Sequence, residues 1–241
     1  MRAFLRRRLS AEEYLGLHLT IGLLLCLGAI ALFAAVARGA LSEGAVDRFD
    51  HEVGESLAHH RETHPWVREF FLGVTQLGSE KVIIVVAVVV AILLVWRRRR
   101  LLALAWLCYL LGGGLLDAGL KLVFGRDRPE FRDVEVHETT LSFPSGHAMG
   151  SLMTYGLLIY LLALILPRRR GWRWIALALV LVILLIGCSR VYLGAHYFSD
   201  VLGGYCVGLA WMAACISAIE TVRRRARKNA GDTINTNDLT V

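Results

Sequence analysis

Long apolar stretches and short polar connections alternate along the whole chain. Six of these stretches are long enough to be membrane-spanning helices: 15–37, 78–96, 101–124, 148–166, 172–188 and 201–219. A helix needs about 20 apolar residues to cross a hydrocarbon core of roughly 30 Å. Because a helix satisfies its own backbone hydrogen bonds in lipid, the pattern predicts an all-α fold, a bundle of six transmembrane helices.

The composition agrees with a membrane protein, since 56% of the 241 residues are hydrophobic, more than an ordinary soluble domain carries. The first stretch follows a basic N-terminus and could be a signal peptide, but its length favours a helix that is retained as an anchor. We expect one integral-membrane domain over residues 1–228 and a polar, disordered tail over 229–241.

Basic residues are concentrated at alternate connections. The N-terminus, the run 97–100, the connection 167–173 and the C-terminal run 223–228 carry most of the 27 lysines and arginines. The positive-inside rule therefore predicts that these connections and both termini are cytoplasmic. The other connections are then expected on the outer face of the cell's inner membrane.

The first outer connection, residues 38–77, is the longest and contains two amphipathic segments. In the first segment, apolar residues recur at helical spacing: Val46, Phe49, Val53 and Leu57. The second segment covers residues 65–74. Both are predicted to be helices that lie at the membrane interface.

The cysteines and histidines are not spaced in a pattern typical of a metal site or a disulfide. Its five cysteines lie in apolar stretches without a C-x-x-C pair and are expected to be small buried hydrophobes. His59, His60 and His64 could bind a metal, but a solvated polar face explains them better. We expect no metal and no other cofactor.

Three cations run against the charge bias. The stretch GLKLVFGRDRPEF, residues 119–131, puts Lys121, Arg126 and Arg128 on the outer side, directly before Pro129. One such cation could simply reach from a helix end to the interface. Three of them beside a proline indicate that an anion is held there.

The end of the same connection reads PSGH and leads into the fourth apolar stretch. Ser145 is a good N-cap, and Gly146 lets the backbone approach a ligand closely. The first-turn N–H groups and the helix dipole make such a junction suitable for an anion. A simple helix cap with an incidental His147 is the alternative.

The connection between the fifth and sixth stretches carries Arg190, His196 and Asp200. His196 and Asp200 are four residues apart and share one face if the entry to the sixth helix is helical. A carboxylate on one imidazole nitrogen makes the other nitrogen a better base or nucleophile. The alternative is a histidine–aspartate pair that only caps the helix.

An alternating topology brings both outer connections to the same end of the bundle. Ionisable residues near membrane depth are costly, so a cluster of them indicates function. The predicted cluster combines cations, a helix N-terminus, two histidines and a carboxylate, as a phosphate site with a nucleophile and an acid would: Lys121, Arg128, Ser145, His147, Arg190, His196 and Asp200.

These residues also form three ordered motifs: K-x6-R-P at 121–129, P-S-G-H at 144–147, and S-R-x5-H-x3-D at 189–200. Together they resemble the tripartite signature of the type 2 phosphatidic acid phosphatase superfamily. The resemblance implies that His196 takes the phosphoryl group as a phosphohistidine and that Asp200 orients it. It implies that His147 protonates the leaving oxygen and then activates water.

The remaining motif residues are implied to bind phosphate: Lys121, Arg128, Ser145, Gly146 and Arg190. Three fixed cations would make a metal unnecessary. Arg126 lies inside the first motif without matching a fixed position, and no catalytic role is expected for it. Asp117, four residues before Lys121, is a candidate partner for that lysine when the site is empty.

The function expected from the residues and the resemblance is a metal-independent membrane phosphatase that acts on lipid phosphates or diphosphates at the outer interface. Its partners are the lipid substrate and the bilayer, with no nucleic acid. Phosphatidylglycerol phosphate and undecaprenyl diphosphate are the expected substrates. A lipid phosphotransferase and a non-catalytic lipid carrier remain alternatives, although a carrier needs neither nucleophile nor acid.

Overall fold

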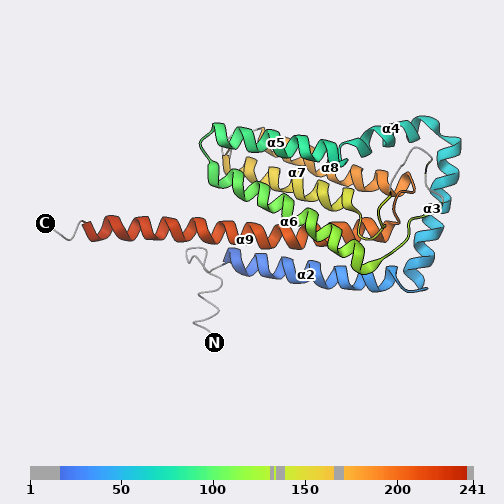
Figure 1. Cartoon of the computed structure of the whole chain (residues 1–241), viewed down its shortest axis with the longest axis horizontal. Coiled ribbons are helices and arrows are strands. Elements are labelled where there is room, and N and C mark those ends of the chain that lie inside the picture. The colour runs from blue at the N-terminus through green and yellow to red at the C-terminus, as the bar shows by residue number, and fades with distance from the viewer. Residues whose placement is uncertain (1–16, 131–132, 134–138, 166–170, 238–241) are drawn as a thin grey trace. The chain divides into compact units, whose positions relative to one another are not determined.

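The computed structural model describes residues 17–130, 133, 139–165 and 171–237, and this part of the chain contains helices and no strand (Figure 1). The helices are α2 (Leu17–Ala40), α3 (Ala45–Thr63), α4 (Pro65–Gln76), α5 (Glu80–Trp96), α6 (Arg100–Phe124), α7 (Gly146–Ile165), α8 (Trp172–Tyr192) and α9 (Phe198–Asn237). The predicted all-α fold is confirmed.

Five helices are long and apolar enough to cross a membrane: Leu19–Ala40, Arg100–Phe124, Gly146–Leu164, Trp172–Tyr192 and Phe198–Val222. Large apolar side chains such as Leu24, Leu111 and Leu184 are exposed on them. Since lipid tails solvate such side chains, this exposure fits a membrane protein. The side of the membrane on which the termini lie stays a prediction.

The second predicted span differs from a single straight helix. α5 has 17 residues, and it reaches spanning length only together with α4, to which it is joined at a bend of 41°. Six spans result if this bent pair counts as one. Gly78 lies at the break, where an added Cβ would come within 2.5 Å of Ile186. The break therefore lets the chain approach α8 closely.

The contacts divide the chain into two compact units, Ala31–Gly208 and the two terminal parts, Met1–Ile30 with Leu209–Val241. Within the terminal unit, α2 and α9 approach closely, since a Cβ on Gly22 would overlap Ser217. α9 is helical to Asn237, past residue 229 where a disordered tail was expected, and no proline interrupts it. The single domain over residues 1–228 stays a prediction.

Within the larger unit, α7 packs mainly against α8, and α5 packs against α6 (Figure 1). The two amphipathic segments form α3 and α4, as predicted, and both contact α8. Phe33 on α2 stacks on Phe143 at 5.6 Å, and Phe124 meets Phe143 edge-on at 5.1 Å. These rings fix the connection that leads into α7.

The first turns of α9 approach this connection through two glycines. A Cβ on Gly203 would lie 2.7 Å from the ring of Phe143, and one on Gly204 would lie 2.6 Å from the carbonyl oxygen of Ser145. Ser145 and Asp200 are also joined directly, by a 3.0 Å backbone hydrogen bond. The glycines thus allow α9 to sit against the N-terminus of α7.

We predict that Gly204→Ala lowers the melting temperature of the protein in detergent. The new methyl group meets backbone, which cannot rotate away, and such overpacking costs about 1–3 kcal/mol. Gly150→Ala on α7 is the matched control, because nothing lies within 4 Å of its added Cβ. Differential scanning fluorimetry measures both. Equal melting temperatures for the two variants would contradict the close approach of α9 and α7.

Candidate active site

The predicted site residues come from helix ends and connections of one unit. Lys121 is in the last turn of α6, Arg190 is in the last turn of α8, and Asp200 is in the first turn of α9. Three ionisable motif side chains are at most 2% exposed, namely Arg190, His196 and Asp200. Buried ionisable groups need partners, so their contacts decide what the site can do.

His196 lies between two groups with opposite hydrogen-bonding character. Its Nδ1 is 3.4 Å from Oδ2 of Asp200, and its Nε2 is 3.3 Å from Nη1 of Arg128. A guanidinium only donates and a carboxylate only accepts. The neutral tautomer that fits both neighbours therefore carries its proton on Nδ1 and exposes a lone pair on Nε2.

Asp200 is held by more groups than the motif contains. Ser142 donates its hydroxyl to Oδ2 at 2.5 Å, and the backbone N–H of Tyr197 donates to the same oxygen at 2.9 Å. Arg126 donates to Oδ1 at 2.6 Å. These donors fix the rotation of the carboxylate and leave Oδ2 facing His196.

Two of the predicted cations are anchored close to His196. Arg128 donates through Nε to the Thr140 carbonyl at 2.6 Å and through Nη1 to the Ala195 carbonyl at 2.8 Å. Arg190 donates to the hydroxyl of Thr75, on α4, at 2.8 Å. Both guanidinium groups act electrostatically on His196.

The third cation, Lys121, pairs with Asp117 one turn earlier on α6, with Nζ 2.5 Å from Oδ2. Its ammonium group also reaches the start of α7, because a Cβ on Gly146 would lie 3.0 Å from Nζ. The pairing with Asp117 agrees with the expectation for the empty site. Lys121 therefore lies beside the PSGH segment while its charge is shared with a carboxylate.

His147 is the second residue of α7 and is partly buried. An added Cβ on Gly78 would lie 3.2 Å from its ring, so the break between α4 and α5 makes room for the imidazole. It lies within electrostatic range of His196, and also of the three cations Lys121, Arg128 and Arg190. The two histidines and these cations thus occupy one region.

Ser145 begins α7 as the N-cap that the sequence predicted. Its Oγ accepts from the backbone N–H of Ala148 at 3.4 Å. The side chain is fully buried, and Gly146 follows it at the first helical position. The N-terminus of α7 therefore adds partial positive charge beside the lysine and arginines.

The arrangement can hold a tetrahedral anion and attack it. Fixed cations and a helix N-terminus stabilise charge on phosphate oxygens, and the lone pair of His196 is oriented by a buried carboxylate. Among the described residues there is no cluster of three or more histidine, cysteine or acidic side chains arranged to hold a metal ion. His60 and His64 stack on each other at 4.0 Å instead.

The sequence interpretation missed three groups that hold Asp200 or its neighbours: Ser142, Arg126 and Asp50. Ser142 lies two residues before the PSGH motif, and nothing in its local sequence marks it. Arg126 was seen but given no role. Asp50 lies in the first amphipathic segment, which was assigned from its apolar residues alone, and it is 1% exposed. A buried charge in that segment is detectable only once the fold is known.

A family model described as the PAP2 superfamily matches residues 102–224, a range that contains all three motifs. This chain belongs to the PAP2 superfamily. A crystal structure of a PAP2 type phosphatidylglycerolphosphate phosphatase from Bacillus subtilis superposes with a TM-score of 0.76 at 29% identity. The match covers 82% of this chain and 97% of that one.

Two relatives of this PAP2 protein are named for their reactions. Phosphatidylglycerophosphatase B of Bacillus subtilis is 30% identical over 198 residues, which cover 82% of this chain and 96% of the relative. Lipid A 1-phosphatase of Rhizobium johnstonii is 36% identical over 109 residues, which cover 42% of this chain and 40% of the relative. The expected family and enzyme class, a multi-pass membrane phosphatase, are confirmed.

We predict that His196 of the PAP2 site stays neutral at mildly acidic pH. Burial lowers its pKa, the hydrogen bond to Asp200 opposes this, and the nearby Arg190 and Arg128 add to the lowering, giving a value of about 4. Because about 4 is below the usual value near 6.5, the imidazole remains unprotonated at pH 5.5, where a free histidine is mostly charged.

Nuclear magnetic resonance of the protein labelled at histidine measures this titration, with the His196 signals identified by their loss in His196→Asn. Free histidine in the same detergent buffer is the control. A midpoint for His196 near 6.5 would contradict the burial and the arginine neighbours described above.

Proposed function

We propose that the protein hydrolyses the phosphate ester or diphosphate of a membrane lipid through a phosphohistidine on His196. The observation that carries this proposal is the orientation of one buried imidazole. Its Nδ1 faces Asp200, and its Nε2 faces Arg128, a donor suited to a phosphate oxygen. A non-catalytic carrier only has to bind the lipid and does not require an oriented nucleophile.

In the first step, the lone pair on Nε2 of His196 attacks phosphorus, and the bond from phosphorus to the leaving oxygen breaks. His147, which takes up a proton when the negatively charged phosphate binds, gives that proton to the leaving oxygen. The imidazole becomes positive as the new bond to phosphorus forms, and the carboxylate of Asp200 balances this charge through Nδ1–H. Positioning of both histidines against the substrate lowers the activation barrier, because the reacting groups are already oriented.

In the second step, the now neutral His147 removes a proton from water, and the resulting nucleophile attacks phosphorus. The bond to Nε2 breaks, its electron pair returns to His196, and inorganic phosphate leaves. If the alcohol of another lipid replaces water, the same site is a phosphotransferase. We favour hydrolysis because the two named relatives are phosphatases.

The three cations replace a metal in this mechanism. Arg128 and Arg190 lie beside His196, and Lys121 exchanges Asp117 for a phosphate oxygen when substrate binds. Their charges stabilise the equatorial oxygens in the transition state, and their anchored positions avoid reorganisation during the reaction. Ser145 and the Gly146 backbone complete the cradle at the start of α7.

The substrate we propose is a long-chain lipid phosphate. The site lies at the ends of apolar helices, so a lipid can place its phosphate there while its tail remains in the bilayer. Burial of hydrocarbon contributes about 0.8 kcal/mol per CH₂, which a short ester lacks. We rank phosphatidylglycerol phosphate first, because the phosphatidylglycerophosphatase matches over most of its length. Undecaprenyl diphosphate is second.

We predict phosphate release from phosphatidylglycerol phosphate in mixed micelles, with a higher kcat/KM than for p-nitrophenyl phosphate. His196→Ala and His147→Ala should lower kcat by about 10⁴-fold or more, because each removes a reacting group. Asp200→Asn should leave more residual activity, and EDTA should leave the rate unchanged. Colorimetric assay of free phosphate measures all of these.

Acceptor lipids added to the same assay separate hydrolase from phosphotransferase. Arg48→Gln, an exposed cation on α3, is the control for general loss of basic residues. Equal kcat/KM for the lipid and the short ester would contradict the proposed preference for lipid substrates. Loss of activity in EDTA, followed by recovery when Mg²⁺ is added, would contradict the proposal that the mechanism needs no metal.

We further propose that the site faces the outer side of the inner membrane, since the run 97–100 and the connection 167–173 carry the basic residues expected in the cytoplasm. In a background with all five cysteines replaced by alanine, Glu130→Cys should react with an impermeant maleimide on intact cells. Gly171→Cys should react only after lysis. The reverse labelling pattern would put the site in the cytoplasm.

A further inference from the structure

Arg126 bridges two buried carboxylates from different helices. Its Nη1 is 2.6 Å from Oδ1 of Asp200 on α9, and its Nη2 is 3.0 Å from Oδ2 of Asp50 on α3. The Arg126 side chain is 9% exposed, and both carboxylates are fully buried. Burial opposes its charge, but the two carboxylates outweigh this and raise the pKa of Arg126. It is therefore a fixed cation.

Asp50 is more than a partner for this arginine. Its Oδ1 accepts the backbone N–H of Ser199 at 3.0 Å, and its Oδ2 accepts the hydroxyl of the same serine. Arg126 also donates to that hydroxyl at 2.7 Å. Asp50 thus ties α3 to the first turn of α9, one residue before Asp200.

The two carboxylate oxygens of Asp200 have different hydrogen-bond partners. Oδ2 faces His196, Ser142 and the backbone of Tyr197, whereas Oδ1 is bound by Arg126. If Oδ1 loses its donor, only the two donors at Oδ2 restrain the carboxylate, and more of its negative charge acts on His196. The position of Arg126 therefore affects both the direction and the basicity of the imidazole.

We propose that Arg126 is a positioning residue of the phosphatase site, held by Asp50, and that it sets the orientation and charge of Asp200 toward His196. This rests on the proposed function, because it assigns His196 as the nucleophile. Arg126 is not assigned a contact with substrate. It couples the docking of the amphipathic helix α3 to the reactivity of the nucleophile.

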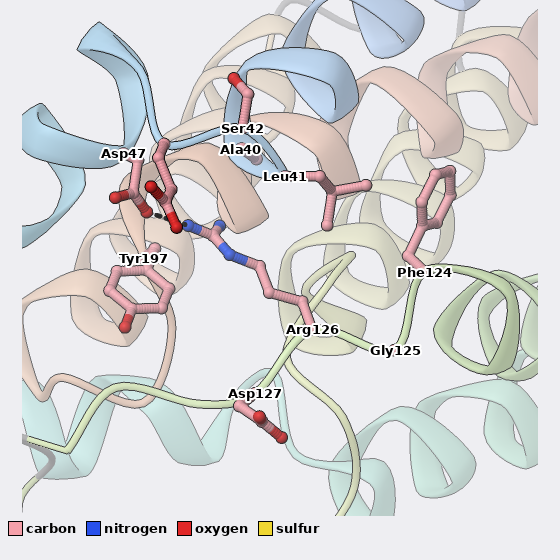
Figure 2. Close-up of a pocket in the computed structure, with 10 residues that line it drawn as sticks. Ala40, Leu41, Ser42, Asp47, Phe124, Gly125, Arg126, Asp127 and Tyr197 are labelled. Atoms are coloured by element: carbon pink, nitrogen blue, oxygen red, sulfur yellow. Dashed lines mark ion pairs between the residues drawn. The ribbon is translucent and has the colours of Figure 1, made fainter.

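A hollow of about 360 Å³ borders Arg126. Figure 2 shows the arginine side chain extending across it toward Asp47 on α3, with the ring of Tyr197 nearby. The guanidinium lies 4.2 Å from the centre of that ring. A small solute can occupy the hollow, so the space left by a truncated Arg126 is accessible to a guanidinium ion.

The test measures kcat and KM of Arg126→Ala and Arg126→Lys with a long-chain lipid phosphate. We expect kcat of Arg126→Ala to fall by about ten- to a hundred-fold with little change in KM, as for a misoriented catalytic group. Guanidinium chloride at millimolar concentration should restore part of kcat. Sodium chloride at equal ionic strength should not restore it, and wild type should not respond to either salt.

Two aspartates on α3 provide the matched pair. Asp50→Asn should lower kcat in the same way and gain nothing from guanidinium, because its arginine is still present. Asp47→Asn should change kcat less than two-fold, because that carboxylate is partly exposed and lies 3.8 Å from Arg126. Equal effects of the two substitutions would overturn the role of Asp50.

The pH profile of kcat/KM separates positioning from simple loss of packing. His196 is faced by Asp200 from α9, Arg190 from α8, His147 from α7 and Arg128 from the connection before α7. Removal of Arg126 leaves the charge of Asp200 less balanced, which favours protonated imidazole. The acid limb of Arg126→Ala should move toward neutral pH, and guanidinium should move it back.

Thermal unfolding in detergent checks that each variant is folded. If Arg126→Ala does not fold, Arg126→Lys and Asp50→Asn carry the test through lower kcat at unchanged KM. If these variants keep the kcat and the pH profile of the wild type, the inference about Arg126 is overturned and the proposed function is not affected. Absence of lipid phosphatase activity in wild type would instead overturn the proposed function.

Discussion

A negative charge buried at the start of α9 organises this end of the protein. Asp200 has no exposed side-chain surface, and a carboxylate in such a place is stable only when its oxygens are paired and hydrogen-bonded. Its four partners come from two connections: Arg126 and Ser142 from the one between α6 and α7, and His196 and the Tyr197 backbone from the one between α8 and α9. The requirement to satisfy one carboxylate therefore joins α9 to both of these connections, and α3 joins through Asp50.

The apolar helices cannot supply these partners within their spans. Side chains along them face lipid or each other, and polar groups there are expensive. The charged residues therefore collect at helix ends, where close contacts between backbones replace large side chains. Gly204 against Ser145, and Gly78 beside His147, are the two places where a missing Cβ gives the polar residues room.

Much of this could be predicted because apolar length and motif spacing are local properties. The span starting near residue 100 and the one starting near 172 appeared at their expected positions, and the motif residues converged on one end. The bend between α4 and α5 could not be predicted from hydropathy, because residues 65–76 combine apolar and charged positions. Their path depends on Thr75 and Tyr155, which contact α8 and the α4–α5 break through hydrogen bonds.

The groups that support Asp200 escaped prediction for a different reason. Ser142 and Asp50 are 92 positions apart in the sequence numbering, and neither has a neighbour in the sequence that marks it. Their importance comes from burial beside a charge, which only the fold creates. Arg126 shows the same limit, since its role follows from ion pairs with Asp50 and Asp200, which are distant in the sequence.

The two arginines of the site, Arg128 and Arg190, donate hydrogen bonds to uncharged groups. Arg128 is bound to the Thr140 and Ala195 carbonyl oxygens, and Arg190 is bound to the Thr75 hydroxyl, all of them neutral acceptors. Arg128 also donates through Nη2 to the Thr140 hydroxyl and the Leu141 carbonyl oxygen, so neutral groups surround this guanidinium.

Lys121 differs because its partner, Asp117, is charged and would repel a phosphate. Asp117 also has one carboxylate oxygen, Oδ1, that is buried without a hydrogen-bond partner among the described residues. In the proposed reaction, an incoming phosphate therefore competes with this carboxylate for the ammonium group. We therefore expect weaker binding of any anion that cannot use all three cations at once, and a preference for a phosphate that contacts the start of α7.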